Sequence, residues 1–288
     1  MRPIQVPFFS RRSPIDIRWI ISPKRGVRIK RVLGLIFKRQ DISKEDVTFF
    51  TRKTVSAMEE DFLRINTGIP GLDGMIEGGF PFPSTILLAG ESGCGKTTFC
   101  LQFLSEGARR GERGLFFTTL SEPANWMLRF TSRFKFVDRE AIGRDIIYFD
   151  LGPYFKTRYP PEDRYETLKR VIEEKIVELM PQRIVIDPIT AVGGILREQY
   201  REFVFDLSQS LKNWQATTLL TGEAAFDQRY PMEVAYTSDG IILLYNLEHQ
   251  DGRRRYIEIL KMRGTDHVTG RHMVDISRDG LSVQVGFK

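Results

Sequence analysis

A glycine-rich segment at residues 90–97 constrains the fold of this chain more than any other feature of its sequence. It fits the pattern G-x-x-x-x-G-K-[ST], in which glycines let a loop fold tightly so that its backbone N–H groups point inward at phosphate oxygens. The pattern requires a strand before the loop and a helix after it. Both are predicted, because residues 85–89 form a short apolar run and Lys96–Arg109 has a helical pattern. The segment therefore predicts a phosphate-binding loop inside an α/β fold.

The residues that we expect to bind the nucleotide are Gly90, Glu91, Ser92, Gly93, Cys94, Gly95, Lys96, Thr97 and Thr98. Lys96 places a point charge near the β- and γ-phosphates, and the hydroxyl of Thr97 can ligate Mg²⁺. The helix that begins at Lys96 adds the partial positive charge of its N-terminus. These residues predict a nucleoside triphosphate, ATP or GTP, and Mg²⁺ as cofactors. The alternative is a glycine-rich turn with an incidental lysine.

A buried strand that ends in a carboxylate is predicted at Arg183–Asp187. Its apolar residues carry the chain through the core, and Asp187 emerges at the carboxyl end, the edge at which open parallel sheets bind ligands. A phosphate-bound Mg²⁺ needs a carboxylate at such a place. We therefore expect Asp187 to complete the metal site with Thr97. The alternative is an aspartate that only caps its strand.

Hydrolysis also needs a group that orients and activates water. Glu122 is the best candidate, because it lies just past the strand predicted at residues 115–119. The alternative is a glutamate that only stabilises the N-terminus of the helix after Pro123, an interaction of about 0.3–1 kcal/mol. Glu91, inside the loop, is a weaker candidate for the same role.

Strand and helix patterns alternate from Arg64 onward. Strands that are separated by helices imply parallel pairing through right-handed crossovers. The predicted strands are residues 85–89, 115–119, 146–149, 184–186 and 217–221. The predicted helices are Lys96–Arg109, a helix after Pro123, and residues 162–180 and 201–214.

After Gly240 the pattern becomes strand after strand, at residues 241–245, 255–262, 272–276 and 281–285. Asp-Gly pairs at 251–252 and 279–280 lie between consecutive runs, and this dipeptide favours tight hairpins. The predicted fold class is therefore α/β. We expect a mostly parallel, twisted sheet with helices on both faces and antiparallel hairpins at its C-terminal end.

The 288 residues carry a formal net charge of +6, but this charge is unevenly placed. Residues 1–57 hold 14 Lys and Arg against 4 Asp and Glu, whereas residues 58–288 hold 29 against 33. We expect residues 1–57 to be a basic, flexible extension and residues 58–288 to form one domain that opens at Met58. The extension has three interpretations: an arm for nucleic acid, an acidic partner or an anionic membrane surface; an Arg-rich targeting peptide; or an upstream stretch from an early assigned start.

Several motifs resemble the KaiC branch of the RecA-like ATPases, over residues 64–286. Residues 67–73 (TGIPGLD), followed by residues 78–81 (GGFP), look like the opening signature of that family. Residues 201–207 (REFVFDL) resemble the helix after its magnesium strand, and residues 261–267 (KMRGTDH) are very close to its K-M-R-G-[ST]-x-H segment. The resemblance implies a RecA-like P-loop core in a single-domain member of the family.

The resemblance also implies a homo-hexameric ring in which Lys261 and Arg263 reach the nucleotide of the adjacent subunit. Two cations added in trans would offset charge on the transferring phosphoryl group, as an arginine finger does. On the chain alone, both residues also fit an exposed, alternating strand. Members of the family usually place paired glutamates after the second strand, where this chain has Ser121 and Glu122. A single acid is therefore left there to position water.

The combined prediction is a ring-forming regulatory ATPase with an unidentified protein partner. The first alternative is a scaffold that binds ATP but scarcely hydrolyses it, because one carboxylate is missing. The second is a DNA-handling ATPase like RecA or RadA, which needs basic loops at residues 188–200 and 223–238. The latter loop carries three acids and one arginine, so nucleic-acid binding is expected only through the basic N-terminal segment.

The apolar runs are too short to span a membrane, and the two cysteines fit a reducing, cytoplasmic setting better than a disulfide framework. We expect Cys94 and Cys100 to be small residues packed near the loop rather than redox sensors. The three histidines lack the spacing of metal ligands. No phosphorylation segment is apparent after the last predicted hairpin, so autokinase activity is not expected.

Overall fold

A computed structural model describes residues 63–119, 129, 131–155, 163–223, 229–250 and 252–284 of the chain. Four features that the sequence predicts lie outside these residues: the basic segment 1–57, the domain start at Met58, the candidate Glu122 and the helix after Pro123. None of the described helices combines the length and the apolar character that crossing a lipid bilayer requires.

The strands of the larger sheet are β3 (Ser84–Gly90), β4 (Gly114–Thr118), β5 (Ile146–Asp150), β6 (Arg183–Asp187), β7 (Thr217–Gly222), β8 (Gly240–His249), β9 (Gly252–Met262), β10 (Arg271–Ser277) and β11 (Gly280–Gln284). A separate antiparallel pair is formed by β1 (Arg64–Ile65) and β2 (Phe80–Pro81). The helices are α3 (Leu72–Met75), α4 (Lys96–Arg109), α6 (Gly152–Phe155), α7 (Arg164–Leu179), α8 (Thr190–Leu196), α9 (Tyr200–Asn213) and α10 (Met232–Thr237), with a short 3₁₀ helix at Arg197–Gln199.

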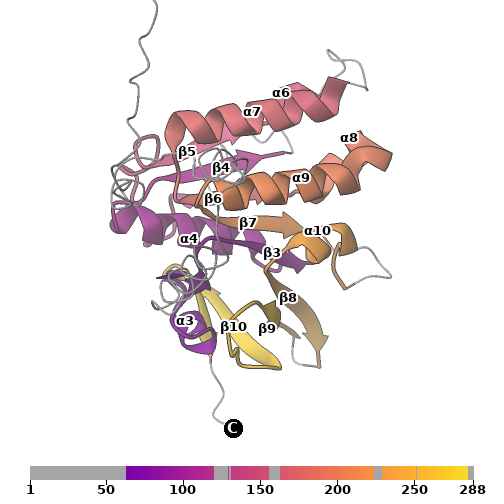
Figure 1. Cartoon of the computed structure of the whole chain (residues 1–288). Helices are drawn as coiled ribbons and strands as arrows, with labels where there is room; N and C mark the ends of the chain where they lie inside the picture. Colours follow the sequence, from indigo (N-terminus) through magenta and orange to yellow (C-terminus); the bar gives the residue numbers. More distant parts are fainter. Residues whose placement is uncertain are drawn as a thin grey trace, which may run out of the picture. The chain divides into compact units, whose positions relative to one another are not determined.

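The larger sheet has nine strands in the order β11-β10-β9-β8-β3-β7-β6-β4-β5. The strands from β8 to β5 in this order run parallel to one another, and β9, β10 and β11 continue the sheet as antiparallel hairpins (Figure 1). Strand β3 lies between β7 and β8, near the middle of the sheet. The predicted α/β class, with a parallel block that ends in hairpins, is confirmed.

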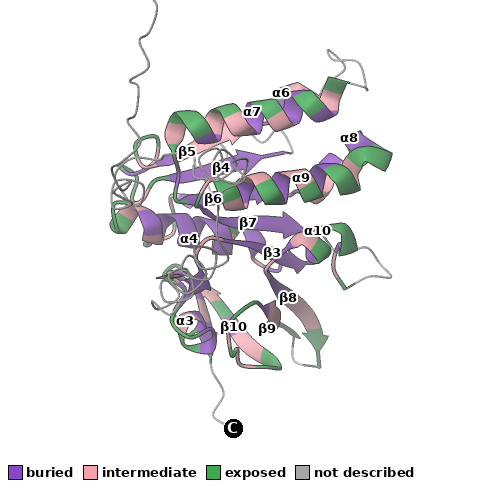
Figure 2. Cartoon of the chain, viewed as in Figure 1, coloured by how far each residue is buried: buried purple, intermediate pink, exposed green. Residues whose placement is uncertain are grey.

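Both faces of the sheet are covered by helices, because the strands of the parallel block are apolar on both sides. In β3, Ile86 and Leu88 belong to the core shared with Phe99 and Phe103 of α4. Leu87, on the opposite face of β3, belongs to the core that α7, α8, α9 and α10 cover. Figure 2 shows these central strands as buried throughout and the outer sides of the helices as exposed. The prediction of helices on both faces is therefore confirmed.

The two predicted Asp-Gly hairpins are also confirmed, since His249 pairs with Gly252 and Ser277 pairs with Gly280. Both glycines have a positive φ, 126° and 105°, which a residue without a Cβ adopts at little cost. The DNA-handling alternative needs loops at residues 188–200 and 223–238, and the structure differs from this in the described parts of both segments. They contain the short helices α8 and α10, and both helices pack on α9.

Arg183 is a large buried side chain, 1% exposed, at the start of β6. Its Nε donates to Glu112 Oε2 at 2.5 Å, and its Nη1 donates to the carbonyl oxygens of Asn66 (2.8 Å) and Phe103 (2.7 Å). The guanidinium carbon lies 4.6 Å from the centre of the Phe103 ring. Burial lowers the pKa of Arg183, and the bond to Glu112 opposes that shift. This side chain joins β6 to α4 and to the segment before α3.

Arg183→Ala is expected to lower the free energy of unfolding by about 3–5 kcal/mol, because it removes one partner of a buried ion pair and the donor to two backbone carbonyls. Urea unfolding followed by circular dichroism measures the loss. Arg144→Ala is the matched control, because the ion pair of Arg144 with Asp145 lies on the surface and contributes little. Equal losses in the two variants would contradict the structural role of Arg183.

Candidate functional site

The loop between β3 and α4 lies at the carboxyl end of the parallel block, as the sequence predicts. Strand β3 ends at Gly90, where no side chain fits, because a Cβ would overlap the carbonyl oxygen of Leu244 on β8. Helix α4 begins at Lys96, directly after Gly95, which has a φ of 107°. The N-cap residue, Gly95, has no side chain that could bond to the first turn of α4. The N–H groups of this turn and their partial positive charge are therefore available to a ligand at the loop.

The ammonium of Lys96 lies within the curve of this loop, with the side chain only 8% exposed. Its Nζ donates to the carbonyl oxygens of Gly90 (2.8 Å) and Glu91 (2.9 Å). No acidic side chain among the described residues pairs with it. Two neutral acceptors offset only part of the desolvation of a buried charge. An anion that enters the loop therefore meets a weakly screened positive charge.

Asp187 ends β6 and faces the start of α4. Its Oδ2 accepts a hydrogen bond from the hydroxyl of Thr97 at 2.9 Å, and its Oδ1 accepts one from the hydroxyl of Thr221 in β7. Burial raises the pKa of Asp187, while the two hydroxyl donors and the charge of Lys96 act in the opposite direction. The predicted pair of Thr97 and Asp187 is thus brought together. A hydroxyl and a carboxylate are hard oxygen ligands, a donor set that fits Mg²⁺.

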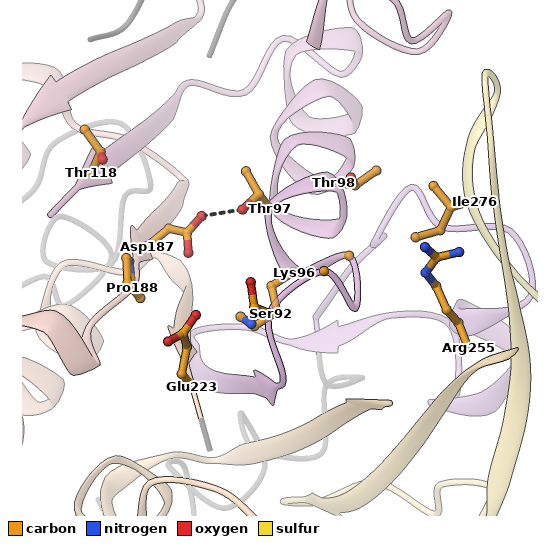
Figure 3. Close-up of a pocket in the computed structure, with 12 residues that line it drawn as sticks. Ser92, Lys96, Thr97, Thr98, Thr118, Asp187, Pro188, Glu223, Arg255 and Ile276 are labelled. Atoms are coloured by element: carbon orange, nitrogen blue, oxygen red, sulfur yellow. Dashed lines mark hydrogen bonds between the residues drawn. The ribbon is translucent and has the colours of Figure 1, made fainter. Parts of the chain in front are cut away.

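A cavity of about 450 Å³ lies over the loop, within the usual size range of ligand pockets. Figure 3 shows the side chains around it. The residues that line it are Ser92, Gly93, Gly95, Lys96, Thr97, Thr98, Thr118, Asp187, Pro188, Glu223, Arg255 and Ile276. Of the predicted loop residues, Gly90, Glu91 and Cys94 do not line this cavity. Glu91 is exposed, and the stronger candidate Glu122 lies outside the described residues.

Sequence reasoning missed five of these lining residues, which are Thr118, Pro188, Glu223, Arg255 and Ile276. A signal existed for Glu223, because a carboxylate directly after a buried strand is the pattern that identified Asp187. Arg255 and Ile276 carried no such signal. They belong to β9 and β10, and their place at the cavity depends on how these hairpin strands fold back beside the loop.

Lys261 and Arg263 lie at the other end of β3 from the loop. Lys261 Nζ donates to the carbonyl oxygen of Ser238 at 2.6 Å, and Arg263 Nη1 pairs with Asp239 Oδ1 at 3.2 Å. Asp239 bonds through its carboxylate and its N–H to the backbone of Thr85, at the start of β3. The length of strand from there to the loop is about 17 Å. Neither cation therefore reaches the phosphate loop of its own chain. Partial burial, together with the charge of Arg263, lowers the pKa of Lys261.

Cys94 and Cys100 are both buried, and burial raises the pKa of each thiol. A buried thiol with a raised pKa is a poor nucleophile, because the thiolate is the reactive form. The environment of both residues fits the packing role that the sequence predicts.

The model of the family described as "ATPase: KaiC" matches residues 65–286 of this chain. The chain is 33% identical over 269 residues to the circadian clock oscillator protein KaiC of Parathermosynechococcus lividus, an alignment that covers 85% of this chain and 47% of that protein. The chain thus spans about half the length of the curated KaiC relatives that it matches.

Two archaeal proteins match over nearly their whole length. A UPF0273 protein of Methanopyrus kandleri is 31% identical over 232 residues, which cover 76% of this chain and 91% of that protein. The crystal structure of a KaiC-like protein from Pyrococcus horikoshii superposes with a TM-score of 0.68 at 31% identity, and the match covers 78% of this chain and 100% of the other. The fold is therefore shared with a solved archaeal protein that the match covers completely. In the longer KaiC protein, the matched region makes up about half of the length.

Proposed function

We propose that this chain, which belongs to the KaiC family of ATPases, binds ATP at the loop of residues 90–97 and hydrolyses it with Mg²⁺. The observation that supports this best is the convergence of Lys96, Thr97 and Asp187 on one cavity at the carboxyl end of the sheet. A buried ammonium beside an uncapped helix N-terminus suits phosphate oxygens. The oxygen donors of Thr97 and Asp187 suit a hard divalent cation.

In the proposed reaction, the loop N–H groups and Lys96 hold the β- and γ-phosphates, while Thr97 and Asp187 hold the metal. Bound Mg²⁺ supplies positive charge that offsets the charge developing on the phosphates. The oxygen of water bonds to the γ-phosphorus, the bond to the β–γ bridging oxygen breaks with its electron pair on ADP, and a proton of the water passes to solvent. Glu122, as the sequence predicts, orients the attacking water.

We further propose that Lys261 and Arg263 act on the nucleotide of an adjacent copy, within a homo-hexameric ring. The distance of Lys261 and Arg263 from the phosphate loop of their own chain supports this proposal, because neither side chain can contact a nucleotide bound there. The Arg263 side chain is 62% exposed and its ion pair to Asp239 is on the surface, so it is free to reach outward. A head-to-tail contact that carries a residue of one copy to the site of the next generates a ring when its rotation closes.

The proposed role of such a ring is regulatory, with the bound nucleotide signalling to a protein partner. Relatives named as circadian clock oscillator proteins support a regulatory role. A scaffold that binds ATP but scarcely hydrolyses it is the second candidate, and Ser121 in the place of a second glutamate favours it.

Asp187→Asn is expected to raise the Mg²⁺ concentration that half-maximal phosphate release requires, by about tenfold or more, because a charged ligand is lost. Phosphate release is measured against Mg²⁺ after removal of metal with EDTA. The variant should remain folded, since an amide can still bond to the hydroxyls of Thr97 and Thr221. Asp145→Asn, on the surface, is the control. An unchanged Mg²⁺ requirement in Asp187→Asn would exclude Asp187 as a metal ligand.

Phosphate release and oligomer mass, each measured with and without ATP, separate the candidate functions. Hexamers promoted by ATP together with turnover support the ring ATPase, whereas hexamers without turnover support the scaffold. Stimulation of turnover by single-stranded DNA would favour a DNA-handling ATPase instead. A protein that does not bind ATP contradicts all three.

A further inference from the structure

Glu223 adds a second carboxylate to the cavity. It directly follows β7, and because Gly222 of β7 pairs with Ala89 of β3, Glu223 comes to lie beside the first residue of the phosphate loop. Its backbone N–H donates to the hydroxyl of Thr190 at 3.3 Å, at the start of α8. The neighbouring strand and this hydroxyl fix its backbone, and the residue lines the same cavity as Lys96.

The Glu223 side chain is exposed in the cavity, and within the part of the chain that the structure describes it makes no hydrogen bond or ion pair. Lys96 and Asp187, in contrast, both have partners. In Figure 3, Glu223 and Asp187 extend from the same side of the cavity, away from Arg255 and Ile276. The carboxylate is therefore free to bond to a molecule in the cavity.

The chemistry of a carboxylate restricts what this molecule can be. Phosphate oxygens repel it, so Glu223 is not suited to hold the nucleotide itself. An ionised carboxylate only accepts hydrogen bonds, and the attacking water is a donor that a phosphoryl-transfer site offers it. The Glu223 side chain has no partner among the described residues, so no contact there gives it a structural role. The bond to Thr190 holds only the backbone of Glu223.

We propose that Glu223 is a catalytic carboxylate of the ATPase site, which orients the attacking water and accepts its proton. This rests on the proposed hydrolysis of ATP. The water oxygen forms the new bond to the γ-phosphorus, the bond to the β–γ bridging oxygen breaks with its electron pair on ADP, and the proton of the water passes to Glu223 and then to solvent. Beside Glu122 this chain has Ser121 in place of a second glutamate. Glu223, directly after β7, thereby supplies the second acid of the site.

The test compares Glu223→Gln, Glu223→Asp and Glu233→Gln in phosphate release and in binding of a fluorescent ATP analogue. Glu223→Gln keeps the size of the side chain but cannot accept a proton, and it is expected to lower kcat about 100-fold or more without weakening nucleotide binding. Glu223→Asp keeps the carboxylate and is expected to retain more kcat than the glutamine variant. Glu233, exposed on α10 and outside this cavity, is the matched control, and Glu233→Gln should turn over like the wild type.

An unchanged kcat in Glu223→Gln would overturn this proposal. The same holds if kcat is unchanged and nucleotide binding becomes tighter, because that result would mean that the carboxylate only repels phosphate. A lower kcat with equally weakened binding and a lower melting temperature would overturn it in favour of a structural role. If the wild type binds ATP but releases no phosphate, the proposed hydrolysis is wrong, and the catalytic role of Glu223 is wrong with it. If the wild type and Glu223→Gln release phosphate alike, only the role of Glu223 fails.

Discussion

Arg263→Ala is expected to lower kcat for ATP hydrolysis by about 10³-fold or more, because an arginine that acts on the transferring phosphoryl group in trans contributes about 10³–10⁵. Within its own chain the side chain makes an exposed pair with Asp239. Asp239 keeps its bonds to Lys212 and Thr85 when Arg263 is removed, so the fold should persist. Phosphate release at saturating ATP measures the effect, and Arg144→Ala is the surface control. Turnover at the wild-type rate in Arg263→Ala would eliminate the finger.

Mixing two inactive variants tests whether the arginine acts on a neighbouring copy. A site is complete when one copy contributes Lys96 and the next contributes Arg263. In rings assembled at random from equal amounts of Lys96→Ala and Arg263→Ala, about a quarter of the sites meet both conditions. We therefore expect the mixture to regain about a quarter of the wild-type rate per site. A mixture as inactive as its components would contradict action in trans.

Lys96→Ala is expected to lower kcat by about 10²-fold or more, the scale at which single charge-stabilising groups act, and to abolish the rise of melting temperature with ATP. The lysine is the one loop residue that brings a full positive charge into the cavity. A ligand at 100 times its Kd stabilises a protein by about 2.7 kcal/mol, so loss of binding is readily seen by thermal unfolding.

The unliganded stability of Lys96→Ala should change far less than its response to ATP. Among the described residues, Lys96 bonds only to neutral carbonyl oxygens and to the Cys94 sulfur, so its removal breaks no buried ion pair there. Lys135→Ala, which removes an exposed pair with Asp279, is the control for loss of a lysine. ATP-dependent stabilisation that persists in Lys96→Ala would show that the phosphates bind elsewhere.

The parts of the fold that the sequence predicts correctly are those set by local patterns. The loop of residues 90–97, the apolar runs and the Asp-Gly turns each specify their structure over a few residues, which is why strand positions and hairpins are confirmed. The pairing of Asp187 with Thr97 is predictable for a related reason. Strand ends in a parallel sheet share one edge, so a carboxylate directly after a buried strand comes near any loop at that edge.

The residues that the sequence does not predict depend on contacts between distant segments. In the sequence, Arg183 is simply the first residue of a predicted strand. Its burial depends on Glu112 and on two backbone carbonyls, which other elements of the fold supply. Arg255 reaches the cavity only because β9 folds back on β8, next to β3. Glu223 is one of the three acids in the segment 223–238, and its position directly after β7 places it at the edge of the phosphate site.

Strand β3 sets the distance between two parts of the chain that the proposed ring assigns to different nucleotide sites. Its start is tied through Asp239 to Arg263, and its end leads into the phosphate loop. In the proposed ring, this distance separates the part of the chain that would reach the neighbouring copy from the part that binds its own nucleotide. One residue more or fewer in Ser84–Gly90 would turn every following side chain to the opposite face and change that distance as well. If Arg263 acts in trans as proposed, the length of β3 is therefore under a constraint that the stability of a single copy would not impose.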